Sequence, residues 1–141
     1  MHDKTTPGRC LCGKVQLEGR GEARIDACHC DMCLHWHGGP GLAVMFEDGI
    51  SIISGEDNIG VYDSSAWATR QFCRNCGATL YFKMKNKEDF SAQAGLFDLP
   101  DDLEIAEHIF VDEKPGWYDF DGDAPRLTAK QTLEKYADQF P

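Results

Sequence analysis

Seven cysteines fall in three short groups, and their spacing constrains this 141-residue chain more than any other feature. The groups are Cys10-x-Cys12, Cys28-x-Cys30-x-x-Cys33 and Cys73-x-x-Cys76. An odd number of thiols cannot all be paired in disulfides within one chain. Spacings this short are typical of metal sites, because they can bring several sulfurs to one ion. The cysteines therefore predict metal binding rather than a framework of disulfides.

The rest of the composition predicts a globular protein from a reducing compartment. The first eight residues contain no apolar run of the kind that marks a secretory signal. No stretch approaches the roughly 18 apolar residues that a membrane span needs, so we expect a cytoplasmic protein in which thiols stay reduced. The 24 acidic and 14 basic residues give a net charge of −10, which disfavours nucleic acid as a partner.

Short β-favouring segments, bounded by turn-forming residues, predict a mainly β fold. The length is that of one domain, taken as residues 1–141. Between two of the segments, Asp48-Gly49 predicts a β-hairpin. The predicted strands are residues 15–18, 23–27, 42–46, 50–53, 60–62, 68–72, 79–84, 90–95 and 104–111.

One helix is predicted, close to the C-terminus, over about residues 128–139. Thr128 can begin it, because Gln131 follows three residues later and completes a capping box. Apolar residues then recur at helical spacing and form one stripe. We expect this stripe to pack against the sheet. Its members are Leu133, Tyr136, Ala137 and Phe140.

Two of the cysteine groups form natural pairs for a closed metal site. In an extended strand Cys10 and Cys12 point to the same face, and Cys73 and Cys76 flank a tight turn that Gly77 makes accessible. Two such pairs complete the four-thiolate site that is usual for structural zinc. The spacing alone leaves open another partition, in which two of the three middle cysteines join a closed site. The partition into four and three leaves no cysteine over.

The remaining set, Cys28, Cys30 and Cys33, offers three ligands, as catalytic zinc sites do. An open fourth position can accept a substrate thiolate or polarise a carbonyl oxygen. The alternative is a structural site closed by a histidine or by a residue of a partner. His35 and His37 follow closely enough to act as ligands or as acid–base groups, whereas surface or packing roles are the alternative for both.

The other residues around this set have less specific patterns. His29 lies between Cys28 and Cys30, so in an extended strand it points away from them and is a poor ligand. The glycine-rich segment 36–41 is either a simple turn or a backbone cradle for a substrate carboxylate or amide. On the second interpretation Trp36, Gly38 and Gly39 are the candidate substrate-binding residues. His108 carries no functional signal in the sequence.

Together these segments resemble the glutathione-dependent formaldehyde-activating enzyme family, which includes centromere protein V. The resemblance lies in residues 8–15, 28–33 and 72–80, and all seven cysteines match the family's motif. Gly38-Gly39-Pro40 and residues 108–118 are similar to segments of bacterial members. The likeness covers about residues 8–120 of the chain.

The resemblance implies a β-tent fold of antiparallel sheets stapled by two zinc ions. Cys10, Cys12, Cys73 and Cys76 would hold the structural zinc. Cys28, Cys30 and Cys33 would hold the active-site zinc, the more labile of the two. The implied activity is that of a carbon–sulfur lyase, which forms S-hydroxymethylglutathione from a small thiol, glutathione, and a small aldehyde, formaldehyde.

Three other functions compete with the enzyme. The first is a zinc-stapled binding or scaffold module, which a fourth protein ligand at Cys28, Cys30 and Cys33 would favour. The second is thiol exchange at Cys73 and Cys76, disfavoured because no thioredoxin-like βαβ context accompanies the pair. The third is electron transfer by iron in the four-cysteine site.

Overall fold

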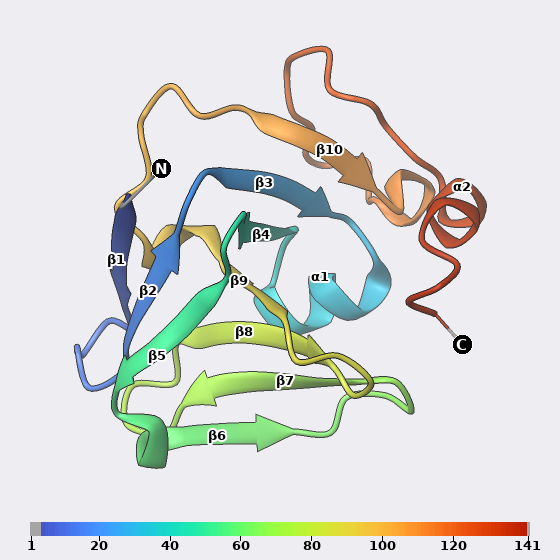
Figure 1. The fold of residues 1–141 in the computed structure, drawn as a ribbon. Helices are drawn as coiled ribbons and strands as arrows, with labels where there is room; N and C mark the ends of the chain where they lie inside the picture. Colours follow the sequence, from blue (N-terminus) through green and yellow to red (C-terminus); the bar gives the residue numbers. More distant parts are fainter. Residues whose placement is uncertain (1–3, 141) are drawn as a thin grey trace. The chain divides into compact units, whose positions relative to one another are not determined.

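The structure is a computed structural model that describes residues 4–140. Within these residues the chain forms ten strands, two α-helices and three 3-10 turns (Figure 1). The strands are β1 (Thr5–Arg9), β2 (Gln16–Arg20), β3 (Ala23–Cys28), β4 (Gly41–Phe46), β5 (Ile50–Ser54), β6 (Ile59–Tyr62), β7 (Ala68–Cys73), β8 (Thr79–Met84), β9 (Phe90–Gln93) and β10 (Ile105–Ile109). The helices are α1 (Asp31–His37) and α2 (Ala129–Lys135), and the 3-10 turns are η1 (Glu56–Asn58), η2 (Ala94–Leu96) and η3 (Val111–Glu113). No helix among the described residues is long and apolar enough to cross a membrane.

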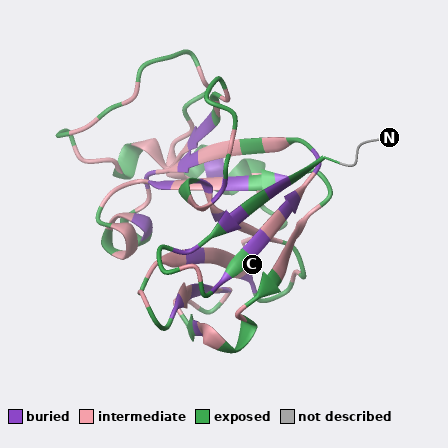
Figure 2. Ribbon diagram, turned by 90° about the vertical axis from the view of Figure 1, so that its left-hand side faces the viewer, coloured by how far each residue is buried: buried purple, intermediate pink, exposed green. Residues whose placement is uncertain are grey.

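The chain divides into two compact units. The first comprises Met1–Arg24 and Val44–Leu103, and the second comprises Ile25–Ala43 and Glu104–Pro141. In the first unit, β1, β2 and β5 form an antiparallel sheet in the order β1-β2-β5, and β9-β8-β7-β6 form an antiparallel run. Buried and exposed residues alternate along β1 and β2, as they do in strands with one face on a core (Figure 2).

Two aromatic rings lie directly against glycines of the first unit. An added Cβ would lie 2.6 Å from the Phe97 ring at Gly8 and 2.4 Å from the Phe46 ring at Gly19. Real Cβ atoms do not come this close, so these rings can reach the strand backbone only where a side chain is missing. Sheet and rings thus form the core beside which the first cysteine group lies.

In the second unit, β10 runs parallel to β3, and Ile109 pairs with Cys28, the last residue of β3. Helix α1 begins three residues later. Helix α2 is fastened to β10 through Glu107, whose carboxylate is 2 % exposed and accepts hydrogen bonds from Lys135 and Tyr136. The end of β3, which leads into α1, is therefore paired with β10, a strand that is itself held by α2.

The mainly β prediction is confirmed, and so is the Thr128–Gln131 capping box of the C-terminal helix. This helix ends at Lys135, earlier than expected. Strand β1 and helix α1 were not predicted, and β3 and β10 depart from the antiparallel rule. The β-favouring runs bounded by turn-forming residues located the remaining strands.

The predicted hairpin at Asp48-Gly49 is wrong, because β4 and β5 belong to different sheets. The chain does turn there, with Gly49 at a φ of 91°. The Gly49 N–H closes the turn by donating to the Phe46 carbonyl at 3.0 Å, and the turn is also bonded to Arg20 at the end of β2. Asp48 N–H donates to the Arg20 carbonyl at 2.9 Å, and Arg20 N–H donates to the Gly49 carbonyl at 3.0 Å.

Candidate metal centres

The four sulfurs of Cys10, Cys12, Cys73 and Cys76 lie within 4.8 Å of one another in the first unit. Cys12 Sγ is 3.6 Å from Cys10 Sγ and 3.8 Å from Cys73 Sγ. Four sulfurs at about 2.3 Å from one zinc ion are separated by about 3.8 Å in an ideal tetrahedron. A disulfide needs about 2.05 Å, so the thiols are free. The group has the dimensions of a zinc–thiolate site.

Both cysteine pairs of this group lie on tight turns. The expectation that Cys10 and Cys12 lie in a strand is wrong. Strand β1 ends at Arg9, and Gly13 closes a turn at a φ of 80°. Gly13 N–H donates to the Cys10 carbonyl at 3.1 Å. The turn after Cys73 does agree with the prediction. Gly77 has a φ of 78° and donates its N–H to the Cys73 carbonyl at 2.8 Å.

Amide groups favour the thiolate form at several of these sulfurs. A hydrogen bond from the Asn75 side chain, followed by one from the backbone of Lys14, lowers the pKa of Cys12 to about 6. Backbone hydrogen bonds from Cys12 and Ala78 lower the pKa of Cys76. Asn58 Nδ2 donates to Cys73 Sγ at 3.2 Å. The site is therefore preset for a cation by donors that the cysteine pattern does not identify.

The sulfurs of Cys28, Cys30 and Cys33 also lie within 4.8 Å of one another, in the second unit. Cys28 ends β3, and Cys30 is the N-cap of α1, where its Sγ accepts the Cys33 N–H at 3.3 Å. Hydrogen bonding to Cys30 and Cys33, together with burial, raises the pKa of Cys28 well above its usual value. Three crowded thiols resist ionisation unless a cation offsets their charge, and thiolates suit zinc.

His35 and His37 lie on different sides of α1. His35 is 80 % exposed in its side chain, and its Nδ1 is 2.9 Å from the Asp31 carbonyl. His37 lies one turn after Cys33, on the same face of the helix. A Cβ placed on Gly41 would be 3.1 Å from His37 Nε2 and 3.4 Å from Cys33 Sγ. The imidazole therefore lies close to the three-cysteine set, on the side that Gly41 keeps open.

The three candidate substrate-binding residues lie at the end of α1. Gly38 closes the helix at a φ of 76° and donates its N–H to the Leu34 carbonyl at 2.8 Å, so this N–H is already bonded. A Cβ on Gly39 would meet nothing within 4 Å. Trp36 is half-buried. The segment is thus in part a helix cap, a role that glycine often takes in the left-handed region.

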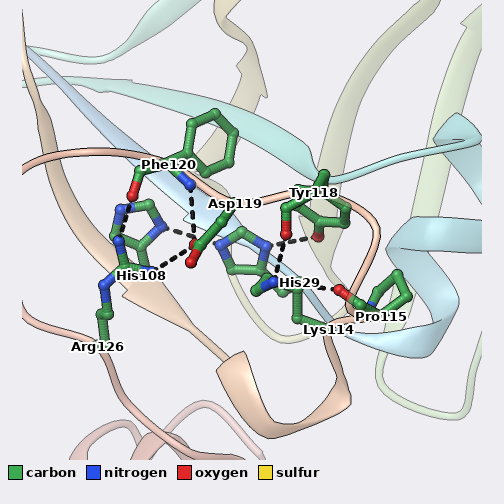
Figure 3. A network of polar contacts seen from close by, with 8 residues as sticks. All are labelled: His29, His108, Lys114, Pro115, Tyr118, Asp119, Phe120 and Arg126. Atoms are coloured by element: carbon green, nitrogen blue, oxygen red, sulfur yellow. Dashed lines mark hydrogen bonds and ion pairs between the residues drawn. The ribbon is translucent and has the colours of Figure 1, made fainter.

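Sequence reasoning missed a buried network in the second unit (Figure 3). His29 and His108 are 0 % and 1 % exposed, and His29 Nε2 lies 2.9 Å from His108 Nδ1. The Tyr118 hydroxyl lies 2.6 Å from His29 Nδ1. Burial, followed by the charge of His108, lowers the pKa of His29 to about 4. His29 is not part of either cysteine cluster that could hold a metal ion. Its partners could not be read from the sequence, because they depend on the register of β10 on β3.

The sequence profile of the family described as glutathione-dependent formaldehyde-activating enzyme matches residues 5–113. The chain belongs to this family. All seven cysteines of this family member fall within the matched residues.

Two further similarities accompany the family match. An uncharacterized lyase of Schizosaccharomyces pombe (strain 972 / ATCC 24843) is 33% identical over 129 residues, which are 90% of this chain and 93% of the relative. A crystal structure of a Rhodobacter sphaeroides protein is similar in fold, with a TM-score of 0.54 and 19% identity. That similarity covers 85% of this chain and 98% of the other. Family and relative support an enzyme of the formaldehyde-activating type.

Proposed function

We propose that this chain is a zinc-dependent carbon–sulfur lyase acting on the adduct of a small thiol and a small aldehyde. Glutathione and formaldehyde, joined as S-hydroxymethylglutathione, are the pair that the family description suggests. The observation that carries the proposal is the convergence of Cys28, Cys30 and Cys33, a group of three among the described residues. Three thiolates leave one position of a tetrahedral ion for a substrate, which a four-cysteine site does not.

In the proposed reaction the thiol S–H adds across the aldehyde C=O. A C–S bond forms, the carbonyl π bond breaks, and the thiol proton ends on the oxygen; the lyase direction reverses each change. Zinc bound there would supply Lewis-acid chemistry and stabilise thiolate. We propose that His37, beside Cys33, transfers the proton to the aldehyde oxygen, which becomes the hydroxyl. Trp36 and Gly39 would contact the substrate, whereas His35 is directed to Asp31.

Metal analysis of paired variants tests the assignment of the two sites. We expect about two zinc ions per wild-type chain, one for each cysteine set. Cys33→Ser should remove the second zinc and leave the protein folded. Cys76→Ser should remove the first zinc and destabilise the first unit. If Cys33→Ser unfolds the protein as severely as Cys76→Ser, the second set is structural and the lyase assignment fails.

Turnover is tested separately with glutathione and formaldehyde, followed by NMR against the uncatalysed rate. We expect acceleration by wild type and its loss in Cys33→Ser. A wild type that carries two zinc ions and gives no acceleration would remove glutathione and formaldehyde as substrates. The cytoplasm, where glutathione is abundant and reduced, is the location that fits this proposal.

A further inference from the structure

His29, the residue between two cysteines of the second set, is held at three points. Its backbone N–H donates to the Ile109 carbonyl at 3.0 Å. Its ring is held by Tyr118 at Nδ1 and by His108 at Nε2, at 2.6 Å and 2.9 Å. Figure 3 shows the His29 ring between these two partners. A side chain that is fully buried and bonded at both ring nitrogens cannot rotate without breaking a hydrogen bond.

Both partners of His29 are themselves fixed. His108 belongs to β10, with its N–H bonded to the Pro125 carbonyl at 2.8 Å. Tyr118 lies on a loop that two cations tie down. Lys114 Nζ donates to the carbonyls of Pro115 and Tyr118, and Arg126 donates to the Asp119 carboxylate and the Phe120 carbonyl. Tyr118 and His108, which together form a clamp on the His29 ring, are therefore each held in place by other hydrogen bonds.

We propose that Tyr118 and His108 are positioning residues for the second metal set. By clamping both nitrogens of the His29 ring, they fix the chain between Cys28 and Cys30 so that three sulfurs converge before a metal binds. The inference rests on the proposed metal at Cys28, Cys30 and Cys33, and it is independent of which adduct is turned over. Groups that orient metal ligands typically contribute 10- to 100-fold in metal affinity.

The protonation of the network agrees with such a clamp. His29 uses one ring nitrogen for each partner, Nδ1 for Tyr118 and Nε2 for His108. A neutral imidazole has one donor and one acceptor nitrogen, and each of the two hydrogen bonds then contains one proton. The ring is saturated on both sides without any charge.

Two substitutions of His108 separate hydrogen bonding from packing. His108→Asn keeps a polar atom near the position of Nδ1 but loses ring volume. His108→Leu keeps most of the volume but leaves His29 Nε2 buried without its partner. If the clamp acts through the hydrogen bond, His108→Asn retains affinity and His108→Leu loses it. A role in packing alone gives the opposite order.

A pair of tyrosine variants supplies the matched control. Tyr118→Phe removes the hydroxyl that holds His29 Nδ1. Tyr136→Phe removes a hydroxyl of the same unit, bonded to Glu107 and remote in sequence from the cysteines. Both variants lose one hydrogen bond to a buried partner, so they are expected to lose similar stability. Tyr118→Phe alone is expected to weaken the second metal.

The affinity of each cysteine set is measured with zinc by chelator competition, and with cobalt by its thiolate charge-transfer absorption. Circular dichroism and the first site, which lies in the other unit, report on folding. We expect Tyr118→Phe and His108→Leu to weaken the second site at least tenfold, and His108→Asn and Tyr136→Phe to remain within about threefold of wild type. Equal affinities in the members of either pair would overturn the inference while leaving the lyase proposal standing. A wild type that binds a single metal would overturn both.

Discussion

Gly41→Ala is the substitution that most directly tests the open side of the second cysteine set. The new methyl group would lie 3.1 Å from His37 Nε2, 3.2 Å from His37 Cδ2 and 3.4 Å from Cys33 Sγ. Ordinary contacts between such atoms begin near 3.5 Å, so the imidazole must retreat by about 0.3–0.5 Å. It can do so, because it is the end of a flexible side chain. A movement of this size changes the site without breaking the fold.

The expected magnitudes follow from this displacement. Overpacking usually costs about 1–3 kcal/mol, and the movable ring places this case at the lower end. Replacing glycine returns about 0.4–1 kcal/mol by restricting the unfolded chain. We therefore expect a net change in folding stability of less than about 1 kcal/mol. Because a 1 Å misplacement can cost about 100-fold in rate, kcat/KM should fall by about 3- to 10-fold.

The matched control is Gly95→Ala, in η2 of the first unit, where an added Cβ also meets nothing within 4 Å. Both variants are assayed for formation of S-hydroxymethylglutathione by NMR and for unfolding by denaturant. Gly95→Ala should keep the wild-type kcat/KM, and Gly41→Ala should lose activity out of proportion to stability. Equal kcat/KM in the two alanine variants would refute the placement of His37 at the reacting centre.

Three further predictions address the metal sites and the buried histidines. Gly55→Ala should destabilise the first unit by more than about 3 kcal/mol, because its Cβ would lie 1.9 Å from the Lys14 carbonyl oxygen. Gly13→Ala has a similar φ but open space around the added Cβ, so it should cost about 1–2 kcal/mol. Chemical denaturation measures both losses of stability. A chelator should remove zinc from the three-cysteine set before the four-cysteine set, as followed by the two phases of zinc release. Because the folded-state pKa of His108 and that of His29 are lowered, the unfolded chain binds more protons below pH 6.5, and stability should fall with acid by up to about 1.4 kcal/mol per pH unit for each proton. His108→Asn should make that slope shallower just below pH 6.5, where the histidines of the unfolded chain take up protons, and an unchanged slope would contradict the burial of a neutral His108.

The sequence located most strands, since β-favouring runs bounded by turn-forming residues are a local signal. It also favoured the grouping of cysteines that the structure brings together, because the partition into four and three leaves no cysteine over, although spacing alone allowed another partition. It did not anticipate α1, a helix of seven residues that follows a cysteine N-cap. The Cys30 N-cap replaces the usual Ser, Thr, Asp or Asn, so the ordinary start signal is missing.

Other features depend on contacts between distant segments and were beyond any local pattern. The hairpin prediction at Asp48-Gly49 failed because the strands on either side of the turn belong to different sheets, and the turn is bonded to Arg20 at the end of β2. His108 carried no signal because its role depends on the parallel register of β10 on β3. A pairing shifted by one residue would direct it to the other face of the sheet. Local turn and strand propensities therefore predicted where strands and turns lie in the sequence, but not which strands pair with one another.

The two cysteine sets differ in how each is prepared for a cation. In the four-cysteine set, amide donors lower the pKa of Cys12 to about 6 and lower that of Cys76, so part of the set is already thiolate at pH 7. In the three-cysteine set, hydrogen bonding among the cysteines and burial raise the pKa of Cys28 and Cys30. Metal binding there must displace protons from thiols that hold them more tightly than usual, which makes it dependent on pH. Such a set needs its sulfurs held in place by other means, and the buried clamp on His29 is the element of the second unit suited to do so.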